Sequence, residues 1–423
     1  MAKIKTLRSA SDKSISHRAA MLSSIAKHEI IIRNYLFAED TVNTIRALEN
    51  LGVNIEIRNS DIIVNPVGKY SFKEPQDILD MGNSGTGIRL LSGLLSGFEF
   101  LSILKGDDSL KSRPMMRIIE PLSKMGAKIM YRQGGYAPLV IYGKSNLNGI
   151  RYESKIASAQ VKSAILFAGL YSDGDVCVKE PIKSRNHTEN MFRYLGIDIE
   201  ENNTEVCLGK NREIYGDCEI NVPADISSSA FFVILSILSD DVEIVLKDVC
   251  LNETRSGILH ILSQCGANYE IDNKRVENNE LVGDLIVKHT KELKPFVIDK
   301  DILPSLIDEI PILSILGIFC DGVSIIKDAS ELRKKESDRI KAICSNLSAV
   351  GVKTEEFEDG FKIYGKPNHT IRKTKINTYN DHRIAMSFTV LSAAKGVDLA
   401  LSENQSIKTS YPGFFDHLNY IIS

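Results

Sequence analysis

A short sequence phrase recurs five times along the chain and constrains its fold more than any other feature. Each copy is an amphipathic helical run, then a glycine, then alternating apolar and polar residues, and the glycines are Gly52, Gly126, Gly196, Gly266 and Gly351. Glycine lacks Cβ, so it ends a helix in a left-handed conformation without steric cost, and the following period of two predicts a strand. The glycines are 74, 70, 70 and 85 residues apart, which predicts a repeated structural unit.

Repeats of this length predict an α/β fold with helices and strands in every unit. The final residues, FFDHLNYIIS, supply a helix where a sixth copy would end, and six units fit two domains of three. A helix–glycine–strand phrase is common in α/β proteins, but five copies at similar spacing argue against coincidence. No linker rich in Pro, Gly or Ser divides the chain, so the best boundary is NVPADISSS at 221–229. If a first strand at 2–10 pairs with the second half, the chain crosses between the domains twice.

Composition excludes several classes of partner. The chain of 423 residues has 52 Lys and Arg against 55 Asp and Glu, and this net charge of −3 argues against nucleic acid recognised by bulk charge. The apolar stretches at 231–238 and 310–320 are too short to span a membrane and predict buried helices. The N-terminal residues lack the apolar core of a secretory signal, and seven scattered cysteines without metal-ligand spacing predict reduced thiols in a cytosolic protein.

Basic and hydroxyl side chains gather where helices are expected to begin. The segment SDKSISHRAAML at 11–22 places Lys13, Ser14 and Arg18 near a helix N-terminus. Free N–H groups and cations in this position predict an anion site, although a capped and solvated helix start explains the segment equally well by itself.

The same combination returns in further segments. The glycine-rich turn DMGNSGTGIRLL at 80–91 opens a helix, but it is neither G-x-G-x-x-G nor a Walker A loop. The other helix starts of this kind lie at 112–122, 156–170, 183–196, 331–347 and 379–388. Seven such starts on a chain of net charge −3 predict that helix N-termini from both halves converge on a ligand with several negative charges.

Two carboxylates are candidates for acid–base chemistry. Asp308 interrupts the apolar run LPSLIDEIPILSILG, where a carboxylate acts either as a helix cap or as a general base. Glu336 lies between Lys335 and Arg339, where it is either a proton donor or an ordinary member of an ion pair.

Nine motifs, in chain order, carry a resemblance to a known family. They are LRSASDKSISHRAAML, GNSGTGIRLL, KSRPM, SAQVKSAILFAGL, SRNHTE, IDEIPIL, ELRKKESDRI, YNDHRIAMSF and KTSYPGFFD. In these motifs and their spacing the chain resembles the 5-enolpyruvylshikimate-3-phosphate synthase family along essentially its whole length. The resemblance implies an α/β fold of two similar domains, each with three βαβαββ units, and a cleft that closes on the substrates. It implies that residues 12–224 are inserted into a discontinuous domain of residues 1–11 plus 225–423.

The resemblance also implies an activity. The family is a transferase of the shikimate pathway towards chorismate and aromatic amino acids, which joins shikimate 3-phosphate and phosphoenolpyruvate and releases phosphate. No metal or organic cofactor is expected, and glyphosate is the expected inhibitor. A monomer in the cytoplasm, with small-molecule substrates and without membrane or nucleic-acid partners, is expected.

Site roles follow from the resemblance alone. Shikimate 3-phosphate would be bound by Lys13, Ser14, Arg18, Ser158, Ala159, Gln160, Arg185, Asp308 and Lys335. Phosphoenolpyruvate would be bound by Lys13, Asn83, Gly85, Thr86, Arg113, Gln160, Arg339, Arg383 and Lys408. The catalytic groups would be Asp308, Glu336 and Lys13, with Asp308 as the base for the 5-hydroxyl and the other two as proton donors. Arg and Lys are needed because the anionic substrates repel each other.

Two residues depart from the common pattern of the family. Ala159 stands where many members have a second Ser, and Leu90 stands where many have Pro. Both resemble a less common class in which some members tolerate glyphosate, but the chain keeps Gly85, whose change to Ala usually underlies tolerance.

Two rival functions stay open at this point. The sibling enzyme that transfers enolpyruvyl to UDP-N-acetylglucosamine usually carries a Cys in its active-site loop, and no Cys precedes Cys177 here. A non-catalytic anion-binding repeat protein is the other rival. The presence of Asp308, Glu336 and Lys13 together argues against it.

Overall fold

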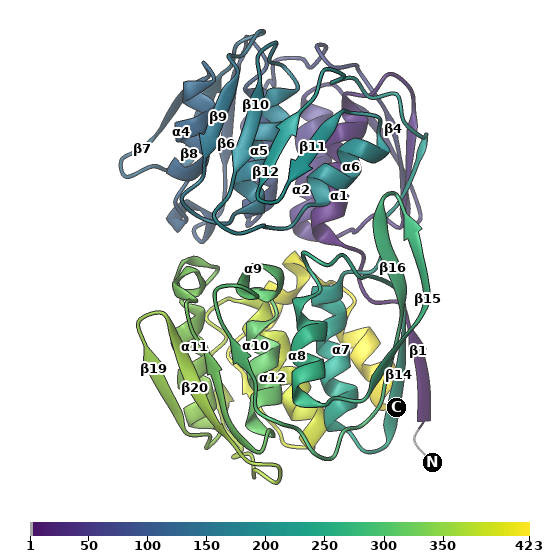
Figure 1. Ribbon diagram of the computed structural model, residues 1–423, viewed down its shortest axis with the longest axis vertical. Helices are drawn as coiled ribbons and strands as arrows, with labels where there is room; N and C mark the ends of the chain where they lie inside the picture. Colours follow the sequence, from purple (N-terminus) through teal and green to yellow (C-terminus); the bar gives the residue numbers. More distant parts are fainter. Residues whose placement is uncertain (1–2) are drawn as a thin grey trace. The chain divides into compact units, whose positions relative to one another are not determined.

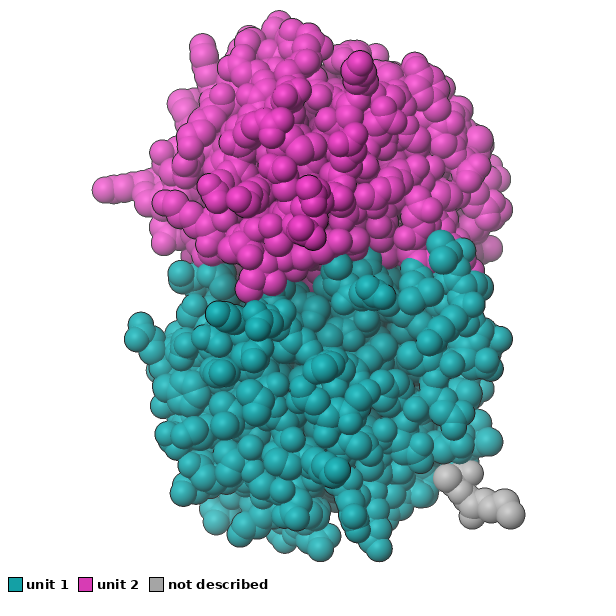
Figure 2. Space-filling model, in the orientation of Figure 1, with its two compact units in different colours: residues 1–12, 223–276, 281–423 teal, residues 13–222, 277–280 magenta. Residues whose placement is uncertain are grey.

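The chain divides into two compact units (Figure 2). The computed structural model describes residues 3–423. Unit 1 contains the chain up to Asp12, Pro223–Val276 and Leu281–Ser423, and unit 2 contains Lys13–Val222 and Glu277–Glu280. The sequence analysis placed the boundaries one or two residues away, after residues 11 and 224, and did not foresee the assignment of residues 277–280 to unit 2.

Unit 2 contains three four-stranded sheets of one design (Figure 1). In each, two parallel strands are followed by an antiparallel hairpin. The first, in the order β13-β2-β4-β3, has strands Glu219–Asn221, Ile30–Arg33, Asp61–Asn65 and Asn54–Arg58. The second, β5-β6-β8-β7, has strands Leu79–Asp80, Leu101–Lys105, Tyr136–Tyr142 and Lys128–Arg132. The third, β11-β12-β10-β9, has strands Ile199–Asn202, Glu205–Leu208, Val176–Lys179 and Ile150–Glu153.

Six helices and one short 3₁₀ turn connect the strands described in unit 2. The helices are α1 (Lys13–Ser24), α2 (Glu39–Asn50), α3 (Gly85–Leu95), α4 (Met116–Lys124), α5 (Ala159–Gly169) and α6 (His187–Tyr194), and the turn is η1 (Leu110–Ser112). Helices α3 and α5 are almost entirely buried. They pack so closely that a Cβ on Gly93 would lie 2.2 Å from the carbonyl oxygen of Ala164. Such a contact allows only glycine at position 93.

Unit 1 repeats the same sheet design. The sheet β1-β14-β16-β15 has strands Lys3–Leu7, Val242–Cys250, Glu280–Val287 and Tyr269–Glu277. The sheet β17-β18-β20-β19 has strands Val297–Ile298, Gly322–Ile326, Gly360–Gly365 and Thr354–Phe357. Only the parallel pair β21 (Lys375–Ile376) and β22 (Ala400–Leu401) forms in the last unit, because α13 replaces its hairpin.

The helices of unit 1 form its apolar centre. They are α7 (Ile226–Leu238), α8 (Gly257–Cys265), α9 (Leu303–Leu306), α10 (Ile310–Ile318), α11 (Arg339–Ala349), α12 (His382–Lys395) and α13 (Phe414–Ile422), with 3₁₀ turns η2 (Ser330–Lys334) and η3 (Gln405–Thr409). Figure 1 shows α7, α8, α10 and α12 between the strands labelled β19 and β20 and those labelled β14 and β16. Every residue of α7 and α10 is buried, which confirms the prediction from the two apolar stretches. Among residues 3–423, no helix has the length and apolar character needed to cross a membrane.

Apart from residues 277–280, the chain passes between the units twice, and next to each passage a strand pairs with a sheet partner that is far along the sequence. Strand β1 pairs in parallel with β14, far along the sequence, and β13 pairs in parallel with β2. Each unit therefore contains one sheet in which the outer parallel strand is far in sequence from the other three strands. This strand is β1 in unit 1 and β13 in unit 2. The sequence predicted that the first strand would pair with the second half, but it gave no sign of the pairing between β13 and β2.

Two cysteines differ from the sequence-based prediction. Cys177 in β10 and Cys207 in β12 form a disulfide, although all seven thiols were predicted to be reduced. The two residues face each other in the antiparallel ladder with Cα atoms 4.1 Å apart. Sequence spacing could not reveal this pair, because the register of the sheet brings it together.

The five repeated glycines all have the predicted conformation. Each lies between the last helix of its unit and the hairpin that follows, with φ of +93° at Gly52, +112° at Gly126, +84° at Gly196, +69° at Gly266 and +97° at Gly351. L side chains rarely adopt this region. The repeat therefore has a backbone origin, because each unit needs a left-handed residue to turn from helix to strand.

Gly266 allows the backbone cost to be measured alone. A Cβ at this position would meet no described atom within 4 Å beyond its chain neighbours, so Gly266→Ala adds conformational strain without a clash. We expect the change to lower the free energy of unfolding by about 1–2 kcal/mol in chemical denaturation. Gly266→Asn should cost less, because Asn tolerates this conformation. Equal stability of wild type and Gly266→Ala would contradict the explanation.

Candidate active site

Helix α1 carries the first predicted substrate residues. Lys13 is its first residue, and its Nζ donates to Oδ2 of Asp40 in α2 at 2.9 Å. Arg18 is buried, and it donates from Nε to Thr188 Oγ1 at 2.7 Å and from Nη2 to Ser163 Oγ at 2.8 Å. Arg18 therefore connects α1 with α5 and α6, in addition to any role with substrate.

The glycine-rich turn before α3 brings together three residues predicted to bind phosphoenolpyruvate. Nη2 of Arg113 donates to Asn83 Oδ1 at 2.6 Å, and its Nη1 donates to the Asn83 carbonyl at 3.3 Å. Gly85 is the first residue of α3 and is buried. A Cβ on Gly85 would lie 2.8 Å from Arg89 Nη1 and 3.2 Å from Arg113 Nη1. Glycine at this position therefore leaves room for two guanidinium groups.

Gln160 connects this turn with the start of α5. Its Nε2 donates to Thr86 Oγ1 at 3.0 Å, and its Oε1 accepts from Arg89 Nη1 at 2.7 Å. The sequence placed Gln160 against both substrates, and in the structure it contacts one of the predicted phosphoenolpyruvate residues.

The remaining predicted shikimate-phosphate residues of unit 2 lie in two loops that share a carboxylate. Glu180 accepts from the backbone N–H of Ser158 at 2.9 Å and from the hydroxyl of Ser184 at 2.8 Å. Arg185 follows Ser184 directly. The half-buried members of the predicted shikimate-phosphate set in unit 2 are Lys13, Ser14, Ser158, Ala159, Gln160 and Arg185.

Unit 1 surrounds Asp308 with cations. Its Oδ1 lies 3.4 Å from Lys335 Nζ and 3.5 Å from Arg339 Nη1, and its Oδ2 lies 4.0 Å from Arg255 Nη1. Arg383 Nη1 donates to the Asp308 backbone carbonyl at 3.2 Å. The structure therefore brings together the predicted base and three other predicted site residues, and it adds Arg255.

Arg339 is the buried centre of a second set of ion pairs. Its Nη2 donates to Glu336 Oε2 at 2.6 Å, and its Nε donates to Asp381 Oδ2 at 2.8 Å. Burial alone would raise the pKa of the Asp381 carboxyl, but the Arg339 guanidinium outweighs it and the pKa is lowered. Asp381 also accepts from the backbone N–H of Arg383 as the N-cap of α12. It therefore fixes two predicted phosphoenolpyruvate residues.

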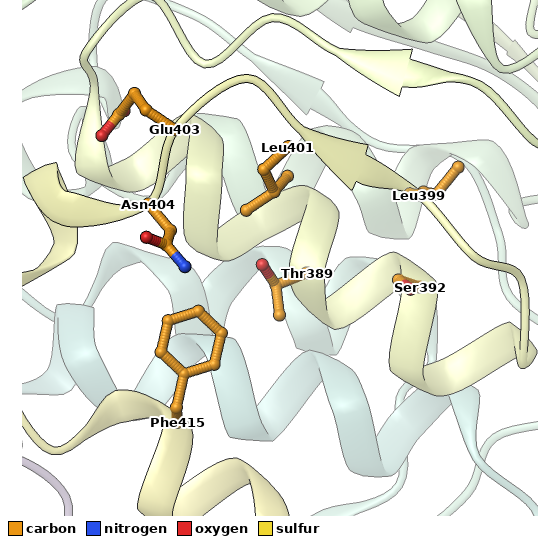
Figure 3. Close-up of a pocket in the computed structure, with 7 residues that line it drawn as sticks. All are labelled: Thr389, Ser392, Leu399, Leu401, Glu403, Asn404 and Phe415. Carbon is orange, nitrogen blue, oxygen red and sulfur yellow. The ribbon is translucent and has the colours of Figure 1, made fainter.

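Among the predicted residues of unit 1, Lys408 is the one that no described contact joins to the others. It is exposed on η3, and no hydrogen bond or ion pair within residues 3–423 joins it to the Asp308 cluster. A cavity of about 380 Å³ lies near η3, where Asn404, Thr389 and Phe415 point into the same space (Figure 3). Its lining contains no Lys or Arg, so it does not suit an anionic substrate, and no predicted site residue lines it.

Sequence reasoning missed several residues that hold the predicted ones. Arg89 and Asp381 lie inside recognised motifs, so their motifs were the available signal. The others, which lie outside the motifs, are Asp40, Glu180 and Arg255. Nothing in the local sequence distinguishes these from surface charges, because their partners are distant in the chain.

Comparisons with known proteins identify the family of the chain. A family model described as EPSP synthase (3-phosphoshikimate 1-carboxyvinyltransferase) matches residues 4–418. The chain belongs to the EPSP synthase family. A relative named 3-phosphoshikimate 1-carboxyvinyltransferase, from Thermodesulfovibrio yellowstonii, is 47% identical over 412 residues, covering 97% of this chain and 95% of the relative. One of the same name from Persephonella marina is 45% identical over 421 residues, covering 99% of this chain and 96% of the relative.

Solved structures support the same family. EPSP synthase from Acinetobacter baumannii has a TM-score of 0.88 and 37% identity, covering 99% of this chain and 96% of that one. The enolpyruvyl transferase NikO from Streptomyces tendae shares the fold, with a TM-score of 0.77 and 16% identity over 99% of this chain and 94% of its own. These findings confirm the family and the α/β fold predicted from the nine motifs.

His17 connects α1 to the glycine-rich turn of α3. Its Nδ1 lies 2.7 Å from Thr44 Oγ1, and its Nε2 lies 3.2 Å from the Oγ of Ser84, the N-cap of α3. Burial, and then the neighbouring charges of Lys13 and Arg18, lower the pKa of His17 well below its usual value of 6.5. His17 is therefore neutral at pH 7. A neutral ring suits this place, because both ring nitrogens contact hydroxyl groups and the two neighbouring charges, Lys13 and Arg18, are cations.

This neutral histidine predicts a pH dependence of stability. Below pH 6.5 His17 becomes protonated in the unfolded chain but stays neutral in the native state, because its native pKa is lower. The unfolded state therefore binds more protons, and the free energy of unfolding falls as pH falls. We expect His17→Gln to destabilise the protein at pH 7.5, and the wild-type advantage to shrink by up to about 1.4 kcal/mol per pH unit below 6.5. Urea denaturation of both proteins at pH 7.5, 6.5 and 5.5 measures this difference. An advantage that is constant with pH would show that His17 is not the titrating group.

Proposed function

We propose that the protein transfers the enolpyruvyl group of phosphoenolpyruvate to the 5-hydroxyl of shikimate 3-phosphate and releases phosphate. Membership of the EPSP synthase family supports this proposal, and so do the names of its relatives. The observation that carries it is the carboxylate of Asp308 among Lys335, Arg339 and Arg255, because a base for a hydroxyl and cations for anions are both required.

The chemistry assigns roles to the clusters. Asp308 takes the proton of the 5-hydroxyl as that oxygen attacks C2 of phosphoenolpyruvate, and C3 receives a proton from Glu336 or Lys13. Phosphate then leaves C2 of the tetrahedral intermediate while a proton is removed from the C3 methyl group, which restores the carbon–carbon double bond of the enolpyruvyl product. The pair Lys335–Asp308 supports the role of the base, because the lysine ammonium stabilises the ionised carboxylate that accepts the proton.

Substrate binding is divided between the units in this proposal. Arg113, Asn83, Gly85, Thr86 and Gln160 would hold phosphoenolpyruvate in unit 2, and Arg339, Arg383 and Lys408 would hold it from unit 1. Shikimate 3-phosphate would be held by Lys13, Ser14, Arg18, Ser158, Ala159, Gln160 and Arg185 with Asp308 and Lys335. Since both units contribute, we propose that they close on the substrates and exclude water.

The oligomeric state and location follow as further proposals. The expectation of a monomer, the cytoplasmic location and the absence of a cofactor all rest on the family resemblance.

A single assay tests the activity. Incubation with shikimate 3-phosphate and phosphoenolpyruvate should release phosphate, whereas UDP-N-acetylglucosamine in place of shikimate 3-phosphate should not. Release with UDP-N-acetylglucosamine alone would identify the sibling activity instead. Release with neither acceptor would contradict an enzymatic function of this kind.

Asp308→Ala tests the proposed base. We expect kcat to fall by roughly 10²–10⁴-fold while the KM values change much less, because a base acts in the transition state. Asp301→Ala, which removes an exposed carboxylate in the same unit, is the matched control and should keep wild-type kcat. Activity of Asp308→Ala within a few-fold of wild type would remove Asp308 from the mechanism.

Gly85→Ala tests the space around the glycine-rich turn. The new methyl must displace Arg89 and Arg113, and overpacking of this kind costs about 1–3 kcal/mol. We expect the inhibition constant of glyphosate to rise about 5- to 150-fold. The KM of phosphoenolpyruvate should rise less, because glyphosate is the longer ligand and contacts the methyl added at position 85 first. Gly266→Ala, the same change far from the predicted site, should alter neither constant. Equal increases in both constants would show that the crowding does not discriminate between the ligands.

A further inference from the structure

A buried cluster of three charged side chains lies behind the predicted shikimate-phosphate loops of unit 2. Lys162 in α5 places its Nζ 2.9 Å from Oε2 of Glu180 and 2.7 Å from Oε1 of Glu189. All three side chains are at most 1% exposed. Burial would lower the pKa of Lys162, but Glu189 and Glu180 outweigh it and the pKa is raised. Lys162 is therefore a buried cation, with one ammonium for two carboxyl groups.

Glu180 holds both loops with one carboxyl group. Its Oε1 accepts from the backbone N–H of Ser158 at 2.9 Å. Its Oε2 accepts from the backbone N–H of Ser184 at 3.3 Å and from the Ser184 hydroxyl at 2.8 Å. Ser158 is the N-cap of α5, and Ser184 directly precedes Arg185. One carboxylate therefore fixes the start of α5 relative to the segment that carries Arg185.

Lys162 stabilises the buried carboxylate of Glu180 behind the Ser158 and Ser184 loops. A lone buried carboxylate would be costly, and it would repel a phosphate bound to the loops in front of it. The ammonium of Lys162 offsets that charge within hydrogen-bond distance of Glu180. Glu189 in α6 binds the same ammonium, so α5 and α6 are joined behind the loops that they carry.

A second polar layer joins α1 to the same two helices. Ser163 in α5 and Thr188 in α6 lie 2.6 Å apart through their hydroxyl oxygens, and Arg18 donates to both. Ser163 directly follows Lys162, and Thr188 directly precedes Glu189, so the two layers are adjacent along both helices. Helices α1 and α5, which carry predicted shikimate-phosphate residues, and α6, which begins two residues after Arg185, are thus connected through interior polar groups.

We propose that Glu180, which is paired with Lys162, is a positioning residue for shikimate 3-phosphate. It touches no substrate and acts by holding the Ser158 and Ser184 loops in the geometry that binds the phosphate. This inference rests on the proposed function, and it adds residues to which the resemblance assigned no role.

Glu180→Gln is the central test. The amide keeps the shape of the side chain but replaces one acceptor oxygen by a donor, so at least one loop loses its bond. We expect the KM and the calorimetric Kd for shikimate 3-phosphate to rise about tenfold or more, since a hydrogen bond to a charged group is lost. The KM for phosphoenolpyruvate should change less than about threefold, and kcat should fall less than the affinity, because neither the base nor the proton donors are touched.

Glu213→Gln is the matched control. Glu213 also pairs with lysine in unit 2, at 2.9 Å from Lys69 Nζ, but it contacts none of the predicted substrate residues. This variant should keep wild-type constants for both substrates. A purely structural role of Glu180 would instead lower the stability of Glu180→Gln without a selective loss of shikimate-phosphate affinity.

Glu180→Asp keeps the inference testable if the amide variant does not fold. It retains the charge facing Lys162 but retracts the carboxylate by one methylene. Relative to wild type, the loss of affinity should again be larger for shikimate 3-phosphate than for phosphoenolpyruvate. Wild-type affinity for shikimate 3-phosphate in a folded Glu180 variant would overturn the inference and leave the proposed function intact. Failure of the wild type to bind shikimate 3-phosphate would overturn both.

Discussion

Pairing of buried cations with carboxylates is the interaction on which the rest of this structure depends. A protein that binds anionic substrates must bring several cations close together, and a buried cation without a partner is strongly unfavourable. Here Lys13 binds Asp40, Lys162 binds Glu180, Arg255 binds Asp225 and Arg339 binds Asp381, each within 3 Å. These partners hold the cationic groups in place before any substrate arrives.

The repeated unit explains where these groups lie. Almost every predicted site residue lies in a connection from a strand to a helix or in the first turns of that helix. Lys13 follows β1 and opens α1, Gly85 follows β5 and opens α3, and Asp308 follows β17 and precedes α10. N–H groups at helix starts favour anions, so a unit that repeats strand and helix also repeats a favourable place for a phosphate or carboxylate. Evolution of a site for two anionic ligands then needs cations only at a few of these connections.

The sequence contained enough information for the units and most of the site. The five glycines predicted the turns from helix to strand because their left-handed conformation is a local backbone requirement, and the helix starts predicted the anion site because Lys, Arg and Ser are local signals. Pairing partners could not be predicted in the same way. Glu180 looks like any other charged residue until β10 places it beside Ser158, and Cys207 meets Cys177 only through the register of one sheet. Lys408 is the opposite case: its local motif matches the family, but no described contact joins it to the Asp308 cluster.

The pairing of β1 with the distant strand β14 has a consequence during protein synthesis. Unit 2 can complete its three sheets as soon as β13 has been made, but β1 leaves the ribosome first and must wait for β14, since Lys3 pairs with Val242. At about 5–20 residues per second that wait lasts of the order of ten seconds or more. An unpaired strand is a template for aggregation during this time. The strand is short and carries Lys3 and Lys5, and like charges of this kind discourage pairing between nascent chains until the proper partner emerges.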